Sequence, residues 1–273
     1  MNPHLLTTFC ALLESNAGIS LDLSKEYLIK ARLDPVARNN GFTDCEQLLQ
    51  KLVSSPLEAL HWTAFEAMAT HETLFFRDSY PFEMLRETVL PSLIAARKAS
   101  KQLNIWCAAA STGQEPYSLA MLLQDFEAQL QGWSIKILAT DISATALDVG
   151  RKGLYSKLDT SRGLTKEQIA RFFTRTEGDA YQISSKLRSL VEFRTLNLIT
   201  PWFMLPKFDL ILIRNVLIYF NRVHRDLVLN KIHQQLADEQ SYLMLGSSES
   251  IFSSDSYQAV RIGRGSVYQW SRR

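Results

Sequence analysis

Hydrophobic residues recur at helical spacing through the first part of the chain. The first such pattern runs from Leu5 to Leu13 and is broken at Asn16–Gly18. Three more patterns of the same kind follow, and they predict helices over residues 27–36, 48–52 and 57–68. Strand-like alternation is absent from this stretch of sequence. We therefore predict a helical N-terminal domain over residues 1–70.

The pattern changes from about residue 103 onward, where short apolar runs alternate with amphipathic helical stretches. The apolar runs are 103–109, 135–142, 191–198, 208–213 and 242–245, and the helical patterns between them include 117–130 and 222–236. Strands that alternate with helices indicate βαβ units and a largely parallel sheet. The tail, residues 260–268, alternates around a Gly-x-Gly centre and predicts a C-terminal β-hairpin. We predict an α/β fold over residues 71–273.

One stretch, residues 155–196, does not fit this alternation. It holds a helical pattern at 165–173, a polar turn at 174–179, and strand candidates at 181–183 and 190–193. We interpret it as a small β subdomain inserted into the main domain.

Composition excludes several classes of function. The 273 residues carry a formal net charge of only +2, whereas nucleic-acid binders usually carry a strong basic stripe. The N-terminus shows no secretory signal pattern, and no apolar stretch approaches the roughly 18 residues of a membrane span. Cys10, Cys45 and Cys107 are scattered, as expected for reduced, buried thiols. We expect a cytoplasmic monomer with no metal site, no membrane insertion and no nucleic-acid partner.

The first candidate site follows the strand that ends near Cys107. Small residues, Ala108–Gly113, lead into a helix whose first turn contains Glu115 and Pro116. Ligands of open α/β sheets bind at the carboxyl ends of strands, where small residues let the backbone approach them closely. The structural alternative is that Glu115 only complements the helix dipole. The low glycine content argues against a phosphate-binding loop.

The second candidate is Asp141, which ends the next predicted strand. An acidic residue at this position is the usual partner of ribose hydroxyls. The alternative is a turn residue before a helix that Ser143 caps.

The third candidate is the segment 214–220, where a buried strand leaves the sheet at Arg214 and Asn215. These polar side chains are expected to face the cleft. Tyr219 would lie over the reacting centre with its hydroxyl available, unless it is an ordinary core aromatic.

The fourth candidate is His71–Asp78, between the two predicted domains. The guanidinium fork of Arg77 suits orientation of a carboxylate. An exposed Arg77–Asp78 pair, worth little to stability, is the alternative.

Taken together, these segments resemble the CheR family of chemotaxis receptor glutamate methyltransferases over nearly the whole chain. The stretches that carry the resemblance are 71–78, 110–118, 139–142, 214–221 and 247–250. The resemblance implies a Rossmann-like methyltransferase sheet, the cofactor S-adenosylmethionine and the product S-adenosylhomocysteine. By position it implies cofactor contacts at His71, Thr73, Arg77, Glu115, Asp141, Asn197, Leu198, Arg214 and Asn215. Arg77 and Tyr219 match positions at the methyl-transfer site.

The chain departs from the family pattern at three places. His71 stands where Asn is usual, Ala108–Ala110 where Ala-Gly-Cys is usual, and Gln114 where Glu is frequent. The second departure removes a glycine that would let the backbone approach the cofactor.

The activity that the resemblance implies is methyl esterification of glutamates on the cytoplasmic helical domain of chemotaxis receptors. A glutamate with a pKa of about 4.3 is ionised at neutral pH and needs no general base. The enzyme would act mainly by alignment. Two alternatives stay open: a methyltransferase for a nucleobase or small molecule, and a cofactor-binding regulator or scaffold without catalysis. The segment 214–217 lacks the Asn/Asp-Pro-Pro-Tyr motif of many base methyltransferases.

Overall fold

The computed structural model describes residues 1–251 and 255–271 and divides the chain into two compact units. The first unit comprises Met1–Thr70, Asn197–Pro201 and Ile218–Val228. The second comprises His71–Leu196, Trp202–Leu217 and Leu229–Arg273.

The first unit is built on four helices. They are α1 (Pro3–Ala17), α2 (Glu26–Asn39), α3 (Cys45–Ser54) and α4 (Ala59–Met68), with a short helix η1 (Leu23–Lys25) before α2. The side chain of Asn2 caps α1 by accepting a hydrogen bond from the His4 amide, and Gly18 ends the helix in the left-handed conformation. The predicted N-terminal helices are therefore present, with α2 and α3 longer than the apolar patterns alone indicated.

Two later segments complete this unit. At residue 221 the Asn side chain donates a hydrogen bond to the carboxylate of Glu14. The backbone passes so close at Gly18 that an added Cβ would lie 2.9 Å from the side chain of Ile199 and 3.0 Å from that of Phe220. Segments 197–201 and 218–228 thus pack on the N-terminal helices.

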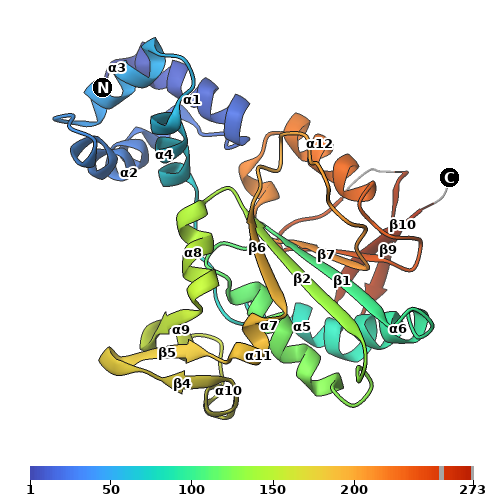
Figure 1. The fold of residues 1–273 in the computed structure, drawn as a ribbon. Helices are drawn as coiled ribbons and strands as arrows, with labels where there is room; N and C mark the ends of the chain where they lie inside the picture. The colour runs from blue at the N-terminus through green and yellow to red at the C-terminus, as the bar shows by residue number, and fades with distance from the viewer. Residues whose placement is uncertain (252–254, 272–273) are drawn as a thin grey trace. The chain divides into compact units, whose positions relative to one another are not determined.

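The second unit contains a seven-stranded sheet in the order β6-β2-β1-β7-β8-β10-β9 (Figure 1). Its strands are β1 (Gln102–Ala108), β2 (Ser134–Asp141), β6 (Val191–Thr195), β7 (Leu210–Ile213), β8 (Tyr242–Leu245), β9 (Tyr257–Ile262) and β10 (Gly265–Trp270). The first five are mutually parallel, and β10 runs antiparallel to both β8 and β9. The parallel sheet, its terminal hairpin and the Rossmann-like class are confirmed.

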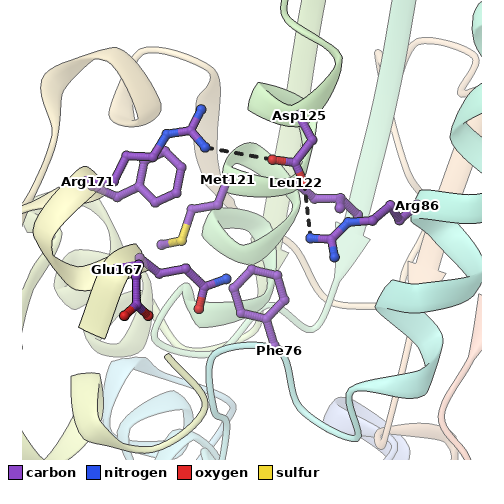
Figure 2. Close-up of a pocket in the computed structure, with 9 residues that line it drawn as sticks. Phe76, Arg86, Met121, Leu122, Asp125, Glu167 and Arg171 are labelled. Atoms are coloured by element: carbon purple, nitrogen blue, oxygen red, sulfur yellow. Dashed lines mark ion pairs between the residues drawn. The ribbon is translucent and has the colours of Figure 1, made fainter. Parts of the chain in front are cut away.

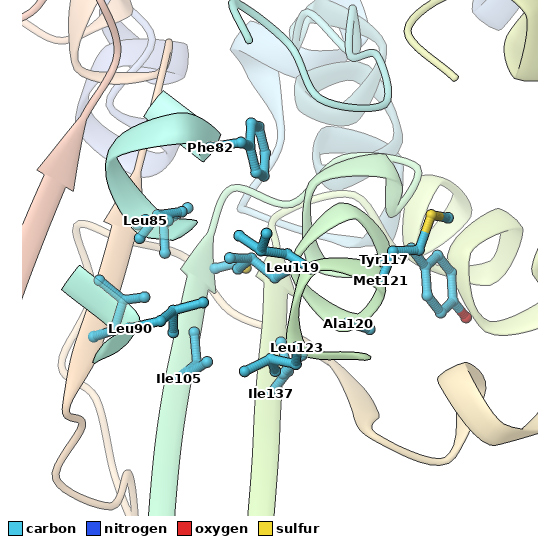
Figure 3. Close-up of a cluster of buried hydrophobic side chains, with 14 of the residues drawn as sticks. Phe82, Leu85, Leu90, Ile105, Tyr117, Leu119, Ala120, Met121, Leu123 and Ile137 are labelled. Carbon is cyan, nitrogen blue, oxygen red and sulfur yellow. The ribbon is translucent and has the colours of Figure 1, made fainter. Parts of the chain in front are cut away.

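Helices cover the sheet and connect its strands. They are α5 (Tyr80–Met84), the π-helical turn η2 (Leu85–Val89), α6 (Leu90–Ala96), α7 (Gln114–Leu123), η3 (Gln124–Phe126) and α8 (Ala144–Lys152). Two further helices, η5 (Leu217–Tyr219) and α12 (Arg222–His233), are divided between the two units, and their residues 218–228 belong to the first. Alternate residues of the strands face opposite sides of the sheet. Ile105 and Ile137 face one side, where they pack in a continuous apolar core with Leu90, Leu119 and Leu123 (Figure 3).

The inserted subdomain is a separate three-stranded sheet in the order β3-β5-β4. Its elements are β3 (Leu154–Ser156), α9 (Lys157–Ser161), α10 (Lys166–Phe172), β4 (Phe173–Arg175), η4 (Glu177–Asp179), β5 (Ala180–Ile183) and α11 (Ser185–Arg188). The strand candidate at 190–193, interpreted above as part of the insert, instead belongs to β6, which pairs with β2 in the main sheet. Its apolar run is as short as those of the insert. Only the pairing with β2 shows that it belongs to the main sheet and not to the insert.

The three cysteines are buried and free, as predicted. In the described part of the chain, the helices lack the combination of length and apolar character needed to cross a bilayer.

Candidate functional site

The candidate residues of the second unit lie at one edge of the main sheet. Strands β2, β1, β7 and β8 are parallel neighbours, so their carboxyl ends meet at the same edge. The register pairs Ala108 of β1 with Ile213 of β7, and Ile213 with Leu245 of β8. The residues that follow these strand ends are therefore brought together by the topology itself.

Arg214 is the centre of this edge, because it follows β7 directly and its side chain is almost completely buried. Its Nη1 donates to Glu115 Oε2 at 2.9 Å, and its Nη2 donates to the Arg77 carbonyl at 2.9 Å and to Asp78 Oδ2 at 3.0 Å. One guanidinium thus joins β7, the start of α7 and the segment that precedes α5. Its buried Nε makes no hydrogen bond among the described residues.

Glu115 is positioned by the turn before it. Gly113 adopts φ 94° immediately before α7. Glu115 therefore lies in the first turn of this helix, where its carboxylate contacts Arg214. Burial raises the pKa of Glu115, and the Arg214 guanidinium opposes that rise. The helix-dipole role considered above is compatible with this position, but the structure adds an ion pair.

Asp141, the last residue of β2, holds the loop after β1. Its Oδ2 accepts a hydrogen bond from the Ser111 amide at 2.8 Å, and its Oδ1 accepts one from the Ser143 amide at 2.9 Å. The side chain of Ser143 caps α8, as the alternative interpretation of this segment predicted. Burial raises the pKa of Asp141, while the two backbone donors lower it. The carboxylate keeps further acceptor capacity for a ligand hydroxyl.

The segment 71–78 is fastened to the same edge at two points. Ser111 Oγ donates to the His71 carbonyl at 2.9 Å, and the Phe76 amide donates to Ser118 Oγ at 2.9 Å. Arg77 itself donates through Nη1 to the Glu72 carbonyl at 2.8 Å. Thr73 lies between these anchors and is half-buried. The hydrogen bonds of this edge therefore form two groups, one around Asp141 and Ser111 and one around Arg214 and Glu115, and the segment 71–78 contacts both.

The remaining predicted residues have other partners. Asn215 is held through its backbone, which donates to Glu249. Asn197, Leu198 and Tyr219 belong to the unit built on the N-terminal helices. There Asn197 Nδ2 donates to the Asn16 carbonyl at 2.6 Å, and the Tyr219 carbonyl accepts from the Ser20 amide at 2.9 Å. Leu198 is buried.

Sequence reasoning missed four residues that hold this site: Asp78 as a partner of Arg214, and Ser111, Ser118 and Glu249. Ser118 follows Glu115 by three residues on α7, so helical spacing alone would have placed both on neighbouring positions of the helix surface. Glu249 lies in the stretch 247–250 that already carried the family resemblance. The Asp78–Arg214 pair has no local sequence signal.

A small cavity of about 110 Å³ lies beside the segment 71–78, where α10 of the insert faces α7 (Figure 2). Phe76 and Met121 line it, and Asp125 at its rim forms ion pairs with Arg86 at 3.0 Å and Arg171 at 3.8 Å. Both arginines share this one carboxylate, and the three side chains are 37–54% exposed, so the two ion pairs are open to water.

Comparison with known proteins gives two family matches that together span most of the chain. A model described as "CheR methyltransferase, SAM binding domain" matches residues 71–265, and one described as "CheR methyltransferase, all-alpha domain" matches residues 5–68.

Similar proteins of known name include "Chemotaxis protein methyltransferase 1" of Vibrio cholerae, 40% identical over 96% of this chain and 94% of that protein. The protein with the same name from Pseudomonas aeruginosa is 40% identical over 96% of both chains. "Chemotaxis protein methyltransferase" of Escherichia coli is 34% identical over 88% of this chain and 82% of that protein.

Proposed function

The chain belongs to the CheR methyltransferase family, and from this premise we propose that it methylates glutamate side chains of chemotaxis receptors with S-adenosylmethionine as the methyl donor. The observation that carries the proposal is the position of Arg214 at the carboxyl edge of the sheet, where its buried side chain contacts the Glu115 carboxylate and the Arg77 carbonyl. The proposed place of action is the cytoplasm, where the acceptor domain of a receptor lies.

The residues of this edge fit S-adenosylmethionine. A nucleoside with two ribose hydroxyls needs a carboxylate at the end of the second strand, and Asp141 supplies it. A zwitterionic amino-acid end needs both signs of charge, which Glu115 and Arg214 offer, and the buried Nε of Arg214 is a further donor. By position, the family resemblance also implies cofactor contacts at His71, Thr73, Asn197, Leu198 and Asn215, and we propose these contacts for each residue.

The chemistry requires little from the protein besides alignment. When bound, S-adenosylmethionine supplies a methyl carbon already activated on a sulfonium, and transfer to a carboxylate oxygen leaves the thioether S-adenosylhomocysteine without moving a proton. The role of Arg77 is to orient the acceptor carboxylate by contact with one oxygen, because a two-oxygen ion pair would reduce its nucleophilicity. Tyr219 shapes the acceptor slot and offers its hydroxyl to an acceptor oxygen. Alignment of this kind supplies several kcal/mol, on the order of 7–11 at most.

The deciding experiment is transfer of a radiolabelled methyl group to the cytoplasmic fragment of a chemotaxis receptor. A base-labile labelled product is expected, because glutamyl methyl esters hydrolyse in base. A base-stable product would mean another acceptor. Cofactor binding without any transfer would favour the regulator or scaffold.

A further inference from the structure

The carboxylate of Glu249 holds the backbone at the ends of two neighbouring strands. It accepts hydrogen bonds from the amides of Asn215 at 2.7 Å, Val216 at 3.0 Å and Gly246 at 2.8 Å. Asn215 and Val216 follow β7, whereas Gly246 follows β8. One side chain therefore fixes how both strands leave the sheet.

These three amides need such an acceptor. The ladder between β7 and β8 ends at the pair Ile213–Leu245, so the donors beyond it have no ladder partner. Asn215 also adopts φ 58°, a left-handed conformation that costs some free energy, although asparagine tolerates it better than most residues. Hydrogen bonds to an ionised acceptor are roughly twice as strong as neutral ones, so Glu249 is suited to impose it.

The backbone at Gly246 lies too close to this contact for a side chain to fit. A Cβ added at Gly246 would lie 2.6 Å from Glu249 Oε2 and 2.8 Å from the Asn215 amide nitrogen. A side chain at Gly246 would therefore have to displace the carboxylate or the bend at Asn215.

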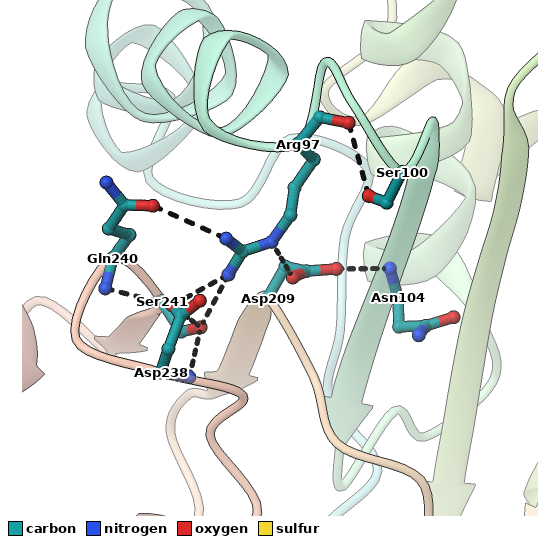
Figure 4. Close-up of polar contacts among 7 residues, drawn as sticks. All are labelled: Arg97, Ser100, Asn104, Asp209, Asp238, Gln240 and Ser241. Atoms are coloured by element: carbon teal, nitrogen blue, oxygen red, sulfur yellow. Dashed lines mark hydrogen bonds and ion pairs between the residues drawn. The ribbon is translucent and has the colours of Figure 1, made fainter.

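The same two strands are held at their opposite ends by a separate cluster around Arg97 (Figure 4). Arg97 Nε donates at 2.6 Å to Asp209, the residue before β7, and its Nη2 donates at 2.7 Å to Asp238, four residues before β8 begins. This cluster lies at the amino ends of the strands, away from the candidate site. It offers a matched control, because weakening it loosens β7 and β8 without touching the carboxyl edge.

We propose that Glu249 is a positioning residue for cofactor binding, which acts by fixing the bend at Asn215 and, through it, the placement of Arg214. This inference rests on the proposed function, in which Arg214 and Asn215 contact the cofactor. Glu249 itself touches neither cofactor nor acceptor in this account. Its effect belongs to cofactor affinity and not to the methyl-transfer step.

The test compares Glu249→Gln with Asp238→Asn. Glu249→Gln keeps the shape of the side chain but replaces one acceptor oxygen with an NH₂ group that faces backbone donors. Calorimetric titration with S-adenosylhomocysteine is expected to show a dissociation constant raised about tenfold or more for Glu249→Gln, and unchanged within about twofold for Asp238→Asn. Thermal unfolding of both variants establishes that each is folded.

Kinetics separate positioning from a merely structural role. Glu249→Gln is expected to raise the KM for S-adenosylmethionine with little change in kcat, whereas partial unfolding would lower the apparent kcat at constant KM. Gly246→Ala disturbs the same contact from the other side, and it should show the same split if Glu249→Gln does not fold.

Three results would overturn the inference: wild-type affinity in both Glu249→Gln and Gly246→Ala, equal weakening by Asp238→Asn, or a loss confined to kcat. The calorimetric titration with S-adenosylhomocysteine needs no methyl acceptor. Failure of receptor methylation by a wild-type protein that binds S-adenosylhomocysteine would therefore refute only the proposed substrate.

Discussion

Arg214 and Glu115 form a buried ion pair, with Arg214 Nη1 2.9 Å from Glu115 Oε2, that joins the end of β7 to the first turn of α7. Their side chains are only 2% and 12% exposed, so water screens the pair poorly. Two residues 99 positions apart are thus linked at the edge where the cofactor is proposed to bind.

Removing one partner of this pair should be costly. Glu115→Ala leaves the Arg214 charge buried with fewer partners, so we expect a loss of about 3–5 kcal/mol in the free energy of unfolding. Glu115→Gln keeps a hydrogen-bond acceptor and should lose less. Urea unfolding of both variants measures the difference. An unchanged unfolding midpoint in Glu115→Ala would show that the pair contributes nothing to stability.

The proposed ribose contact predicts a loss of cofactor affinity in Asp141→Ala. A loss of about 1–3 kcal/mol in binding free energy is expected if the carboxylate accepts hydrogen bonds from ribose hydroxyls. Calorimetry with S-adenosylhomocysteine measures it. Because Asp141 also holds the Ser111 amide, urea unfolding of the same variant shows how far the loss of that contact disturbs the protein. Equal affinity of Asp141→Ala and wild type would exclude the ribose role.

Titration of the Asp141 carboxyl group should make both stability and cofactor affinity depend on pH. Its raised pKa means that the folded state binds a proton more readily than the unfolded chain, so the ionised carboxylate costs stability at neutral pH and this cost disappears as the pH falls. Cofactor affinity has the opposite sign, because the hydroxyls need the ionised acceptor, and it should fall toward acid. Titrations from neutral pH toward acid should show this fall in wild type and a weaker one in Asp141→Asn. Parallel profiles would point to another group.

Tyr219→Phe separates the acceptor site from the cofactor site. The hydroxyl is proposed to contact the acceptor only, so the variant should keep wild-type affinity for S-adenosylhomocysteine and show lower turnover in the methyl-transfer assay. The contact between Ser20 and Tyr219 uses the tyrosine carbonyl, which the substitution leaves in place. An unfolded variant would identify Tyr219 as a core aromatic instead.

Ser118 anchors the segment that carries Arg77. Its buried Oγ accepts from the Phe76 amide and donates to the Gln114 carbonyl at 2.7 Å. Ser118→Ala leaves the amide without this acceptor, so we expect a loss of about 1–3 kcal/mol of stability, measured by urea unfolding. Thr8→Ala, at an exposed hydroxyl on α1, is the control and should change stability little.

Much of the fold is encoded locally and could be predicted. Strands β7 and β8 are short, wholly apolar runs, β1 and β2 each contain an apolar run, and β8 matches its predicted bounds of 242–245. Terminators such as Gly18 and caps such as Ser143 act within a few residues of the elements they bound. The family resemblance supplied the remaining assignments, including the cofactor.

The contacts that assemble the site were beyond local reasoning. Asp78 and Arg214 are 136 residues apart, and Glu249 lies 34 residues from Asn215. Asp78 could pair with its neighbour Arg77 at the surface or with Arg214. The charge pattern of 71–78 does not distinguish these two partners. Only the sheet order, which sets β7 beside β1 and β8, decides which polar residues meet.

The way segments 197–201 and 218–228 pack on the N-terminal helices limits how the chain can be cut. Removal of residues 1–70 takes away Asn16 and Ser20, whose backbones bond to the Asn197 side chain and to the Tyr219 carbonyl, although Asn197 and Tyr219 stay in the shortened protein. The two family matches divide the chain near that point, yet the shortened protein would expose Ile199 and Phe220, which lie against Gly18. Exchange of N-terminal helices between relatives therefore demands matched changes in these two segments.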